Sequence, residues 1–425
     1  MKKEELFLDF DTCLDRKSDN SIKINLQRIC EEVESALGAA SIKSIILTGA
    51  ATRGEASALS YDKGVDIFSD YDLLVVVNEV TVGIYNKLKK VSRTLVEEFS
   101  RENFSPSVDV TPVSIGHLSA MKPSMFALEL KQCGRVLYGD DCKSCIPNVC
   151  PEDIPRQDAL QMLHNRITGV LEYFDPLVFL GEGKQTEQQV KFLIYHIAKN
   201  NIDLGSSLLC FEKMYASGYV KRADILKNDF QRYGFSEKYS GIPNCVEKWT
   251  KFKLIPDIKS LLQERDISGY SCEYLIDLAK TLLNEHIFFM EAVWKYELQK
   301  LYGTKETDTI RLIDIFFAYH RSVSFSRRVK SCLDYIVKPK GVHMKFWGCV
   351  KAIRGHPAIP SLYCLADVLF FFVPCVLQKT TVSARQNIVK FAEKLPFSLP
   401  ANDNSFNTWN AARKQLVVLW RALCC

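Results

Sequence analysis

The chain has 425 residues, of which 47% are hydrophobic and 25% charged, and a formal net charge of +5. These values suit a globular protein of two to three domains with a sizeable core. They give no support to extensive nucleic-acid binding, although they are compatible with a local basic groove. The charged opening at residues 1–6 and the scattered, odd-numbered set of 15 cysteines predict no signal peptide and a reducing, cytoplasmic location.

The first predicted helix covers residues 22–37, where apolar side chains recur at helical spacing. We expect this N-terminal segment, residues 1–40, to pack on the domain that follows. A short predicted strand at 45–47 leads almost directly into Gly49. A glycine after a strand lets the backbone turn sharply and bring amide groups close to a phosphate, and Arg53 adds a planar set of donors suited to phosphate oxygens.

Carboxylates accompany the next two predicted strands. The aliphatic run at 73–77 predicts a buried strand, and Asp70 and Asp72 at its entrance share one face because side chains alternate along a strand. A helix at 82–99 and a strand carrying Asp109 follow. If the two strands pair, the three carboxylates reach one site, where they repel one another unless cations lie between them. The simpler alternative is that Asp70 and Asp72 only accept hydrogen bonds from loop amides.

Together these segments resemble the DNA polymerase β-like nucleotidyltransferase superfamily, in the form of a minimal catalytic domain with an appended helical module. The family signature is a strand, Gly-Ser or Gly-Gly, a short helix, Asp-x-Asp on a second strand and another Asp on a later one. The chain matches it at Arg53-Gly54-Glu55 and Ser69-Asp70-Tyr71-Asp72-Leu73, and the stretch 134–140 resembles the end of such a domain. The resemblance extends over roughly residues 40–225.

The resemblance implies that the turn after the first strand binds the nucleotide, through Gly49, Ala50, Thr52 and Arg53. One of these residues departs from the family pattern, because Ala50 replaces the usual serine, whose hydroxyl helps to hold the triphosphate. Thr48 and Thr52, which flank the turn, are candidates to substitute for that hydroxyl. With this departure, the sequence is compatible with an active enzyme and with an inactive one.

The predicted fold class is α+β: a small mixed β-sheet nucleotidyltransferase domain at 41–141, followed by a larger, mostly α-helical region. Within the first domain, the stretch 56–68 is predicted to be a long loop, and its carboxylates Asp62 and Asp66 are expected to be solvated. A stretch rich in Pro, Asp and Cys marks the end of the domain. Its three cysteines have metal-like spacing without an obvious fourth ligand, so metal binding is left open at Cys142, Cys145 and Cys150.

Beyond residue 155 the apolar spacing predicts helices. We expect a helical domain at 156–305 that closes the cleft, and a C-terminal helical region at 306–425 whose role the sequence does not indicate. The most apolar segment, 359–377, is interrupted by two prolines and an aspartate, so it predicts a buried helix and no membrane span. The individual helices are predicted at 157–174, 187–200, 202–216, 274–302 and 309–335.

Three residues of the helical region are candidates by resemblance alone. In relatives, appended helices supply lysine and serine to the triphosphate, which points to Lys191, Ser206 and Ser207 here. The alternative is that Lys191 lies on a solvated helix face and that the two serines only let helices pack closely.

The resemblance implies a metal-dependent nucleotidyltransferase that moves an NMP from an NTP to a hydroxyl and releases pyrophosphate. Asp70, Asp72 and Asp109 would hold Mg²⁺ or Mn²⁺, and Asp109 would orient or deprotonate the attacking hydroxyl. The acceptor is open among a protein, a small molecule, an RNA end and a second nucleotide, and so is the oligomeric state. The alternative function is a degenerate, non-catalytic relative that binds nucleotide or a partner, including an antitoxin role.

Overall fold

The chain forms two compact units, seen here in a computed structural model. The first contains Met1–Asp158, Leu209–Phe235 and Pro243–Arg265, and the second contains Ala159–Leu208, Ser236–Ile242 and Asp266–Cys425. The structure describes residues 8–62, 64–100, 107–183, 186–235, 237–261, 271–321, 329, 332–333, 336, 342–354, 356–378, 382–397, 399 and 405–424.

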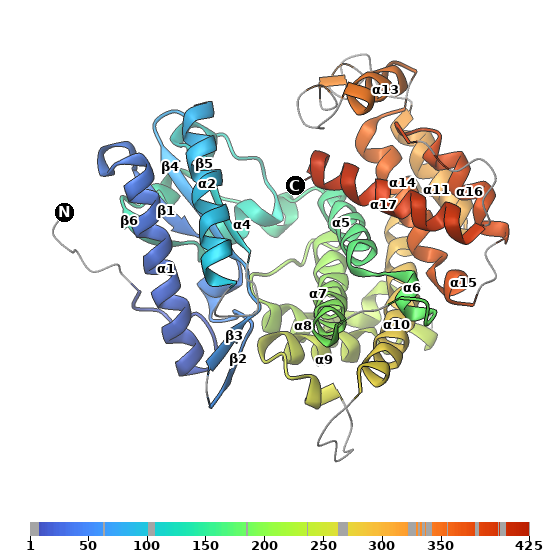
Figure 1. Cartoon of the computed structure of the whole chain (residues 1–425), viewed down its shortest axis with the longest axis horizontal. Coiled ribbons are helices and arrows are strands. Elements are labelled where there is room, and N and C mark those ends of the chain that lie inside the picture. The colour runs from blue at the N-terminus through green and yellow to red at the C-terminus, as the bar shows by residue number, and fades with distance from the viewer. Residues whose placement is uncertain are drawn as a thin grey trace. The chain divides into compact units, whose positions relative to one another are not determined.

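A four-stranded mixed sheet lies at the centre of the first unit (Figure 1). Its strands are β1 (Ser44–Leu47), β4 (Tyr71–Val77), β5 (Val108–Ser114) and β6 (Arg135–Gly139), in the order β5-β4-β1-β6. β4 and β5 run parallel and are joined by α2 (Val82–Phe99), whereas β1 is antiparallel to both of its neighbours. The sheet and the mostly helical chain after it confirm the predicted α+β class.

The two faces of this sheet are covered differently. Alternate residues of β4, beginning with Tyr71, pack with α1 (Arg16–Leu37) and α2 in the larger core. Leu74 and Val76 face the other way, into a smaller core shared with α3 (Ile115–Ser119) and α4 (Met125–Cys133). The predicted helices at 22–37 and 82–99 are thereby confirmed. Because side chains alternate along a strand, Asp72 lies on the face of Leu74.

The stretch at 56–68, predicted as a loop, instead contains a hairpin. β2 (Ala58–Tyr61) and β3 (Gly64–Ile67) pair antiparallel. Alternate residues of β3 are buried in the larger core, which explains why this polar segment forms a strand. Asp62 is exposed, as predicted, whereas Asp66 accepts a hydrogen bond from the Tyr61 hydroxyl within the hairpin.

Two helices from the later part of the chain belong to the first unit: α8 (Tyr219–Asp229) and nearly all of α9 (Ile242–Leu254). The first segment of this unit ends at Asp158, near the predicted boundary at 156, but the units exchange segments after it and show no boundary at 305. The backbone amides at the start of α8 donate hydrogen bonds to Glu55, a residue of the sheet region. Such contacts between distant segments are not visible in local composition.

The second unit is helical. The predicted helices at 187–200 and 202–216 form one continuous helix, α7, which ends at Phe211, and the side chain of Asn201 within it donates to the carbonyl of Ile197. The helix predicted at 309–335 contains α11 at its start, and most of the remaining range, 322–335, lies outside the described residues. The helices are α5 (Arg156–Tyr173), α6 (Pro176–Phe179), α7 (Glu187–Phe211), α10 (Cys272–Tyr302), α11 (Thr309–Arg321), α13 (Val342–Ile353), α14 (Ala358–Phe371), α15 (Val373–Leu377), α16 (Val382–Ala392) and α17 (Ser405–Cys424).

The most apolar stretch of the chain forms α14 and α15. Nearly all of α14 is buried, including Asp367, whose carboxylate contacts the ring of His164 at 3.0 Å. Among the described residues, no helix is both long and apolar enough to cross a membrane. The buried helix predicted for this stretch is confirmed, although the chain divides it in two near Phe372.

Candidate active site

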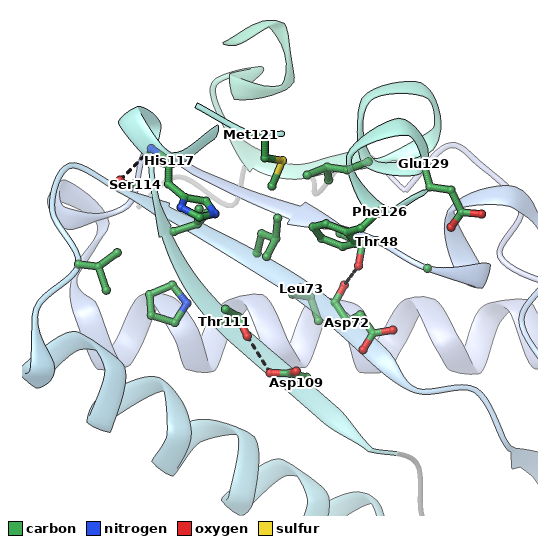
Figure 2. A pocket seen from close by; sticks show the side chains of 16 residues that line it. Thr48, Asp72, Leu73, Asp109, Thr111, Ser114, His117, Met121, Phe126 and Glu129 are labelled. Atoms are coloured by element: carbon green, nitrogen blue, oxygen red, sulfur yellow. Dashed lines mark hydrogen bonds between the residues drawn. The ribbon is translucent and has the colours of Figure 1, made fainter. Parts of the chain in front are cut away.

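Strand pairing brings two of the predicted carboxylates together. In the parallel register of β4 and β5, Asp72 lies directly opposite Asp109. Asp109 projects away from the larger core, since its neighbours Val108 and Val110 are buried there. Both carboxylates line a cavity of about 820 Å³ on the sheet face of α3 and α4 (Figure 2). Asp70 precedes β4, is exposed, and is not among the residues that line this cavity.

The turn after β1 is held against Asp72. The backbone amide and the hydroxyl of Thr48 donate to the carbonyl oxygen of Asp72 at 2.8 and 3.1 Å. Gly49 has a φ of +76°, and a Cβ at this position would lie 3.0 Å from Oδ2 of Asp72. Ala50 begins a short 3-10 helix, and the Thr52 hydroxyl donates to the carbonyl of Gly49 at 2.7 Å. Thr52 therefore stabilises the turn, and the glycine keeps room beside the carboxylate.

Gly49→Ala should destabilise the protein by more than backbone conformation alone. A positive φ costs a residue with a side chain about 1–3 kcal/mol, and here the new methyl group also meets the Asp72 carboxylate. Gly38→Ala is the matched control, because Gly38 has a φ of +79° with nothing within 4 Å of a Cβ. Urea unfolding midpoints should fall further for Gly49→Ala. Equal losses in the two variants would show that the contact with Asp72 contributes nothing.

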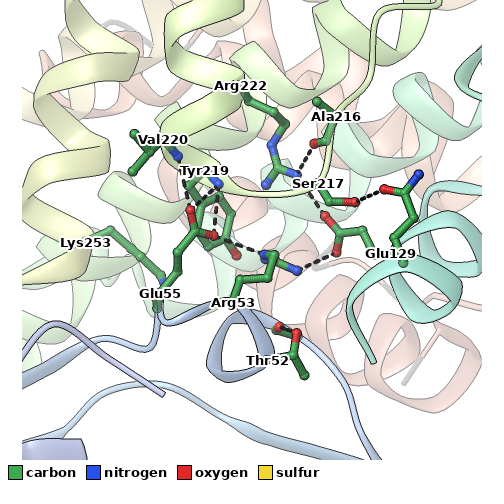
Figure 3. Close-up of polar contacts among 12 residues, drawn as sticks. Thr52, Arg53, Glu55, Glu129, Ala216, Ser217, Tyr219, Val220, Arg222 and Lys253 are labelled. Carbon is green, nitrogen blue, oxygen red and sulfur yellow. Dashed lines mark hydrogen bonds and ion pairs between the residues drawn. The ribbon is translucent and has the colours of Figure 1, made fainter. Parts of the chain in front are cut away.

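Arg53 lies between two carboxylates (Figure 3). Its Nε donates to Glu55 at 3.1 Å, and its Nη1 donates to Glu129 at 3.2 Å. Glu129 also accepts hydrogen bonds from the Arg222 guanidinium and the Tyr215 hydroxyl, both at 2.8 Å. These contacts give Arg53 a structural role within the first unit, which differs from the phosphate contact that the resemblance implies.

Glu55 caps the first turn of α8. Its carboxylate accepts the backbone amide of Tyr219 at 2.7 and 2.9 Å and that of Val220 at 3.2 Å. The first amides of a helix have no partner within the helix, and the positive end of its dipole favours a carboxylate. The ammonium group of Lys253, on α9, donates to the backbone carbonyl of Glu55. The Arg-Gly-Glu motif thus joins the turn after β1 to both later helices of its unit.

Glu129 belongs both to this network and to the cavity wall. Burial by itself would raise its pKa, but the guanidinium groups of Arg222 and Arg53 outweigh burial, and the pKa of Glu129 lies below its ordinary value near 4.5. The carboxylate is therefore ionised at neutral pH. No motif in the sequence points to Glu129, because its partners lie far away along the chain.

The stabilisation from Glu129 should depend on pH in a defined direction. A carboxyl group whose pKa is lowered by folding stabilises the protein above its unfolded pKa, and that contribution is lost as the pH falls through the folded value. The difference in urea midpoint between the wild type and Glu129→Gln should be constant above about pH 5.5 and shrink as the pH falls below about 4.5. A difference that grows on acidification would contradict this assignment.

The three candidates from the helical region lie in the second unit. Lys191 forms an ion pair with Glu187 one turn earlier in α7. The Ser206 and Ser207 side chains are buried; Ser206 donates to a carbonyl of its own helix, and the Ser207 hydroxyl contacts Glu297 at 2.7 Å. These contacts favour the packing alternative for the two serines.

Other groups with metal-like spacing do not converge. Cys142 is buried, whereas Cys145 and Cys150 are exposed. In the part of the chain that the structure describes, no group of three or more His, Cys, Asp or Glu side chains is arranged to hold a metal ion. The strand register thus brings two carboxylates side by side, those of Asp72 and Asp109.

No known family model matches this chain, and no curated protein matches its sequence. The proposed function therefore rests on the geometry of the cavity and on the motifs of the sequence.

Proposed function

We propose that the protein is a nucleotidyltransferase whose reaction centre is the Asp72–Asp109 pair. The observation that supports this most is the register of β4 and β5, in which the two aspartates are direct neighbours on the cavity face. Two carboxylates at directly opposite strand positions repel each other, so the pair has little structural use unless a cation or a substrate balances its charge. The glycine turn beside Asp72 adds backbone amides of the kind that bind phosphate.

In this proposal each residue has a separate task. The turn at Gly49 receives the triphosphate, and Asp72 would hold the cation that accompanies it. Asp109 orients the acceptor hydroxyl and accepts its proton. The acceptor oxygen then forms a bond to the α-phosphorus while the bond from that phosphorus to the bridging oxygen of pyrophosphate breaks. Asp70 is exposed before β4 and lies outside the cavity lining, so it is assigned no part in this step.

The donor set fits a hard divalent cation. Asp72 and Asp109 would hold Mg²⁺ or Mn²⁺ through carboxylate oxygens, the ligands that such cations prefer, whereas Asp70 lies outside the cavity lining. The absence of a side chain at Gly49 keeps space next to Oδ2 of Asp72 that a Cβ would otherwise fill. When bound, the cation would balance the charge of the carboxylates and of the triphosphate.

A screen for pyrophosphate release tests this function. The wild-type protein is incubated with each of the four NTPs and Mg²⁺ or Mn²⁺, with and without cell extract as a source of acceptors, since we place the enzyme in the cytoplasm. We expect release with at least one NTP, and a dependence on extract would show that an acceptor must be supplied. Absence of release with every NTP, in the presence of extract and metal, would contradict the proposal.

A second candidate function is a nucleotide-binding or partner-binding protein that has lost catalysis, which includes an antitoxin role. Two observations favour it: Ala50 lacks the hydroxyl that the family uses, and the Arg53 guanidinium contacts Glu55 and Glu129. Metal-dependent binding of an NTP without any pyrophosphate release would select this candidate.

A further inference from the structure

The cavity continues well beyond the two aspartates. Asp72 and Asp109 lie near the start of β4 and β5, whereas the lining residues Val113 and Ser114 lie at the end of β5. Five register positions separate the two ends, a length of about 17 Å at the rise of a strand. Figure 2 shows Asp72 and Glu129 toward one end and Ser114 with His117 toward the other. The cavity is long enough for a second substrate beside the nucleotide.

The far part of the cavity has a mostly apolar wall. It includes Pro112 and Val113 from β5, Met121 from the covering segment, and Val80 from the loop after β4. Phe126, on the same covering segment, lies toward Thr48 and Asp72 (Figure 2). Val80 is 43% exposed, and a ligand that covers this side chain removes apolar surface from water, which stabilises its binding.

The charges in the cavity are all of one sign. Among its described lining residues, those with a formal charge are Asp72, Asp109 and Glu129, and none is lysine or arginine. Thr111, Ser114 and His117 supply the other polar side chains along β5 and α3. An acceptor that carried a phosphate group would therefore enter the far part without a lysine or arginine partner.

We propose that this far part is the acceptor subsite and that the acceptor is a small, uncharged alcohol or phenol with an apolar body. The inference rests on the proposed function and narrows its substrate class. The acceptor's hydroxyl lies at Asp109, and its body extends along Pro112 and Val113 toward His117. In the transfer step, this hydroxyl oxygen bonds to the α-phosphorus, pyrophosphate leaves, and the hydroxyl proton passes to Asp109. A phosphate group has no lysine or arginine partner in this subsite, so phosphorylated sugars, nucleotides and RNA ends bind there less well than an uncharged acceptor.

Binding without NTP tests the subsite separately from catalysis. The probes are a phenylbutanol with a para-hydroxyl on its ring, and the phosphate ester of that ring hydroxyl, which keeps the alcohol. By titration calorimetry, the uncharged probe should bind at least about tenfold more tightly than the ester, and Met121→Ala should weaken binding of the uncharged probe by about tenfold. Equal or tighter binding of the ester would overturn the proposal.

A charge placed in the wall should invert this preference. Val80→Lys introduces a cation into the cavity lining, so it should weaken the uncharged probe and strengthen the phosphate ester. Val82→Lys is the matched control, because Val82 is 78% exposed and does not line the cavity. The affinity of neither probe should change in Val82→Lys. A similar effect of both variants would also contradict the subsite.

The same variants separate an acceptor subsite from a nucleobase subsite. If the apolar wall held the base of the NTP, Met121→Ala would weaken NTP binding and the NTP would displace the uncharged probe. That result would overturn the acceptor assignment while leaving pyrophosphate release by the wild type intact. If the wild-type protein released no pyrophosphate but bound the uncharged probe as expected, the result would count against the proposed function and not against the subsite.

Discussion

Asp72→Asn should reduce pyrophosphate release by at least about 10³-fold, the scale expected when a charge at a reaction centre is removed. The substitution keeps the size of the side chain, and the strand is held by the carbonyl of Asp72, which accepts from Thr48 and is unchanged. The loss would therefore reflect the carboxylate charge. Initial rates of release, measured beside the wild-type protein, give the ratio.

Two further variants sharpen this result. Asp66→Asn is the control, because this carboxylate is paired in the β2–β3 hairpin and lies outside the cavity lining; it should keep wild-type activity. Asp109→Asn should be as inactive as Asp72→Asn, and the double variant should lose little more, because groups that act as a unit are not additive. Release within tenfold of wild type by Asp72→Asn would refute the assignment.

Glu129→Gln should produce the largest loss of stability, about 3 kcal/mol, which is the lower end of the range for breaking a buried ion pair. The side chains of Arg53 and Arg222 are only 9% and 3% exposed, and both contact the Glu129 carboxylate. The amide would leave two buried guanidinium groups without this counterion. The shift in the urea midpoint measures the loss.

A surface ion pair supplies the comparison. Arg28 and Glu98 contact each other with side chains 41% and 45% exposed, so Glu98→Gln should cost less than about 1 kcal/mol. If the two variants lost similar stability, the network around Glu129 would be no stronger than an ordinary surface contact. We would then no longer assign Glu129 a role in joining Arg53 to α8.

Local patterns were sufficient for the elements that carry the aspartates. The aliphatic run at 73–77 and the valines around Asp109 indicated two strands, and their pairing follows because a helix between two strands commonly makes them parallel neighbours. The alternation rule then set the faces of Asp72 and Asp109 correctly. Asp70 shares that face by the same rule, but it lies before the strand begins, and a strand boundary is harder to predict than its core.

Long-range contacts were not predictable in the same way. Glu129, Arg222 and Lys253 meet the Arg-Gly-Glu motif only after folding, and no spacing in the sequence connects them. The hairpin at 58–67 was missed because half of its residues are polar and its burial comes from the larger core. In both cases tertiary packing determines the structure, and local sequence propensity carries no information about that packing.

The most direct test of the central claim is the fate of the labelled phosphate. The protein is incubated with cell extract and Mg²⁺ or Mn²⁺ and with the NTP that supports pyrophosphate release, labelled either at the α or at the γ phosphorus. Nucleotidyl transfer at the Asp72–Asp109 pair predicts that α label enters an acceptor, that γ label appears only in pyrophosphate, and that Asp72→Asn abolishes both. Transfer of γ label to an acceptor, or transfer of α label that persists in Asp72→Asn, would contradict it.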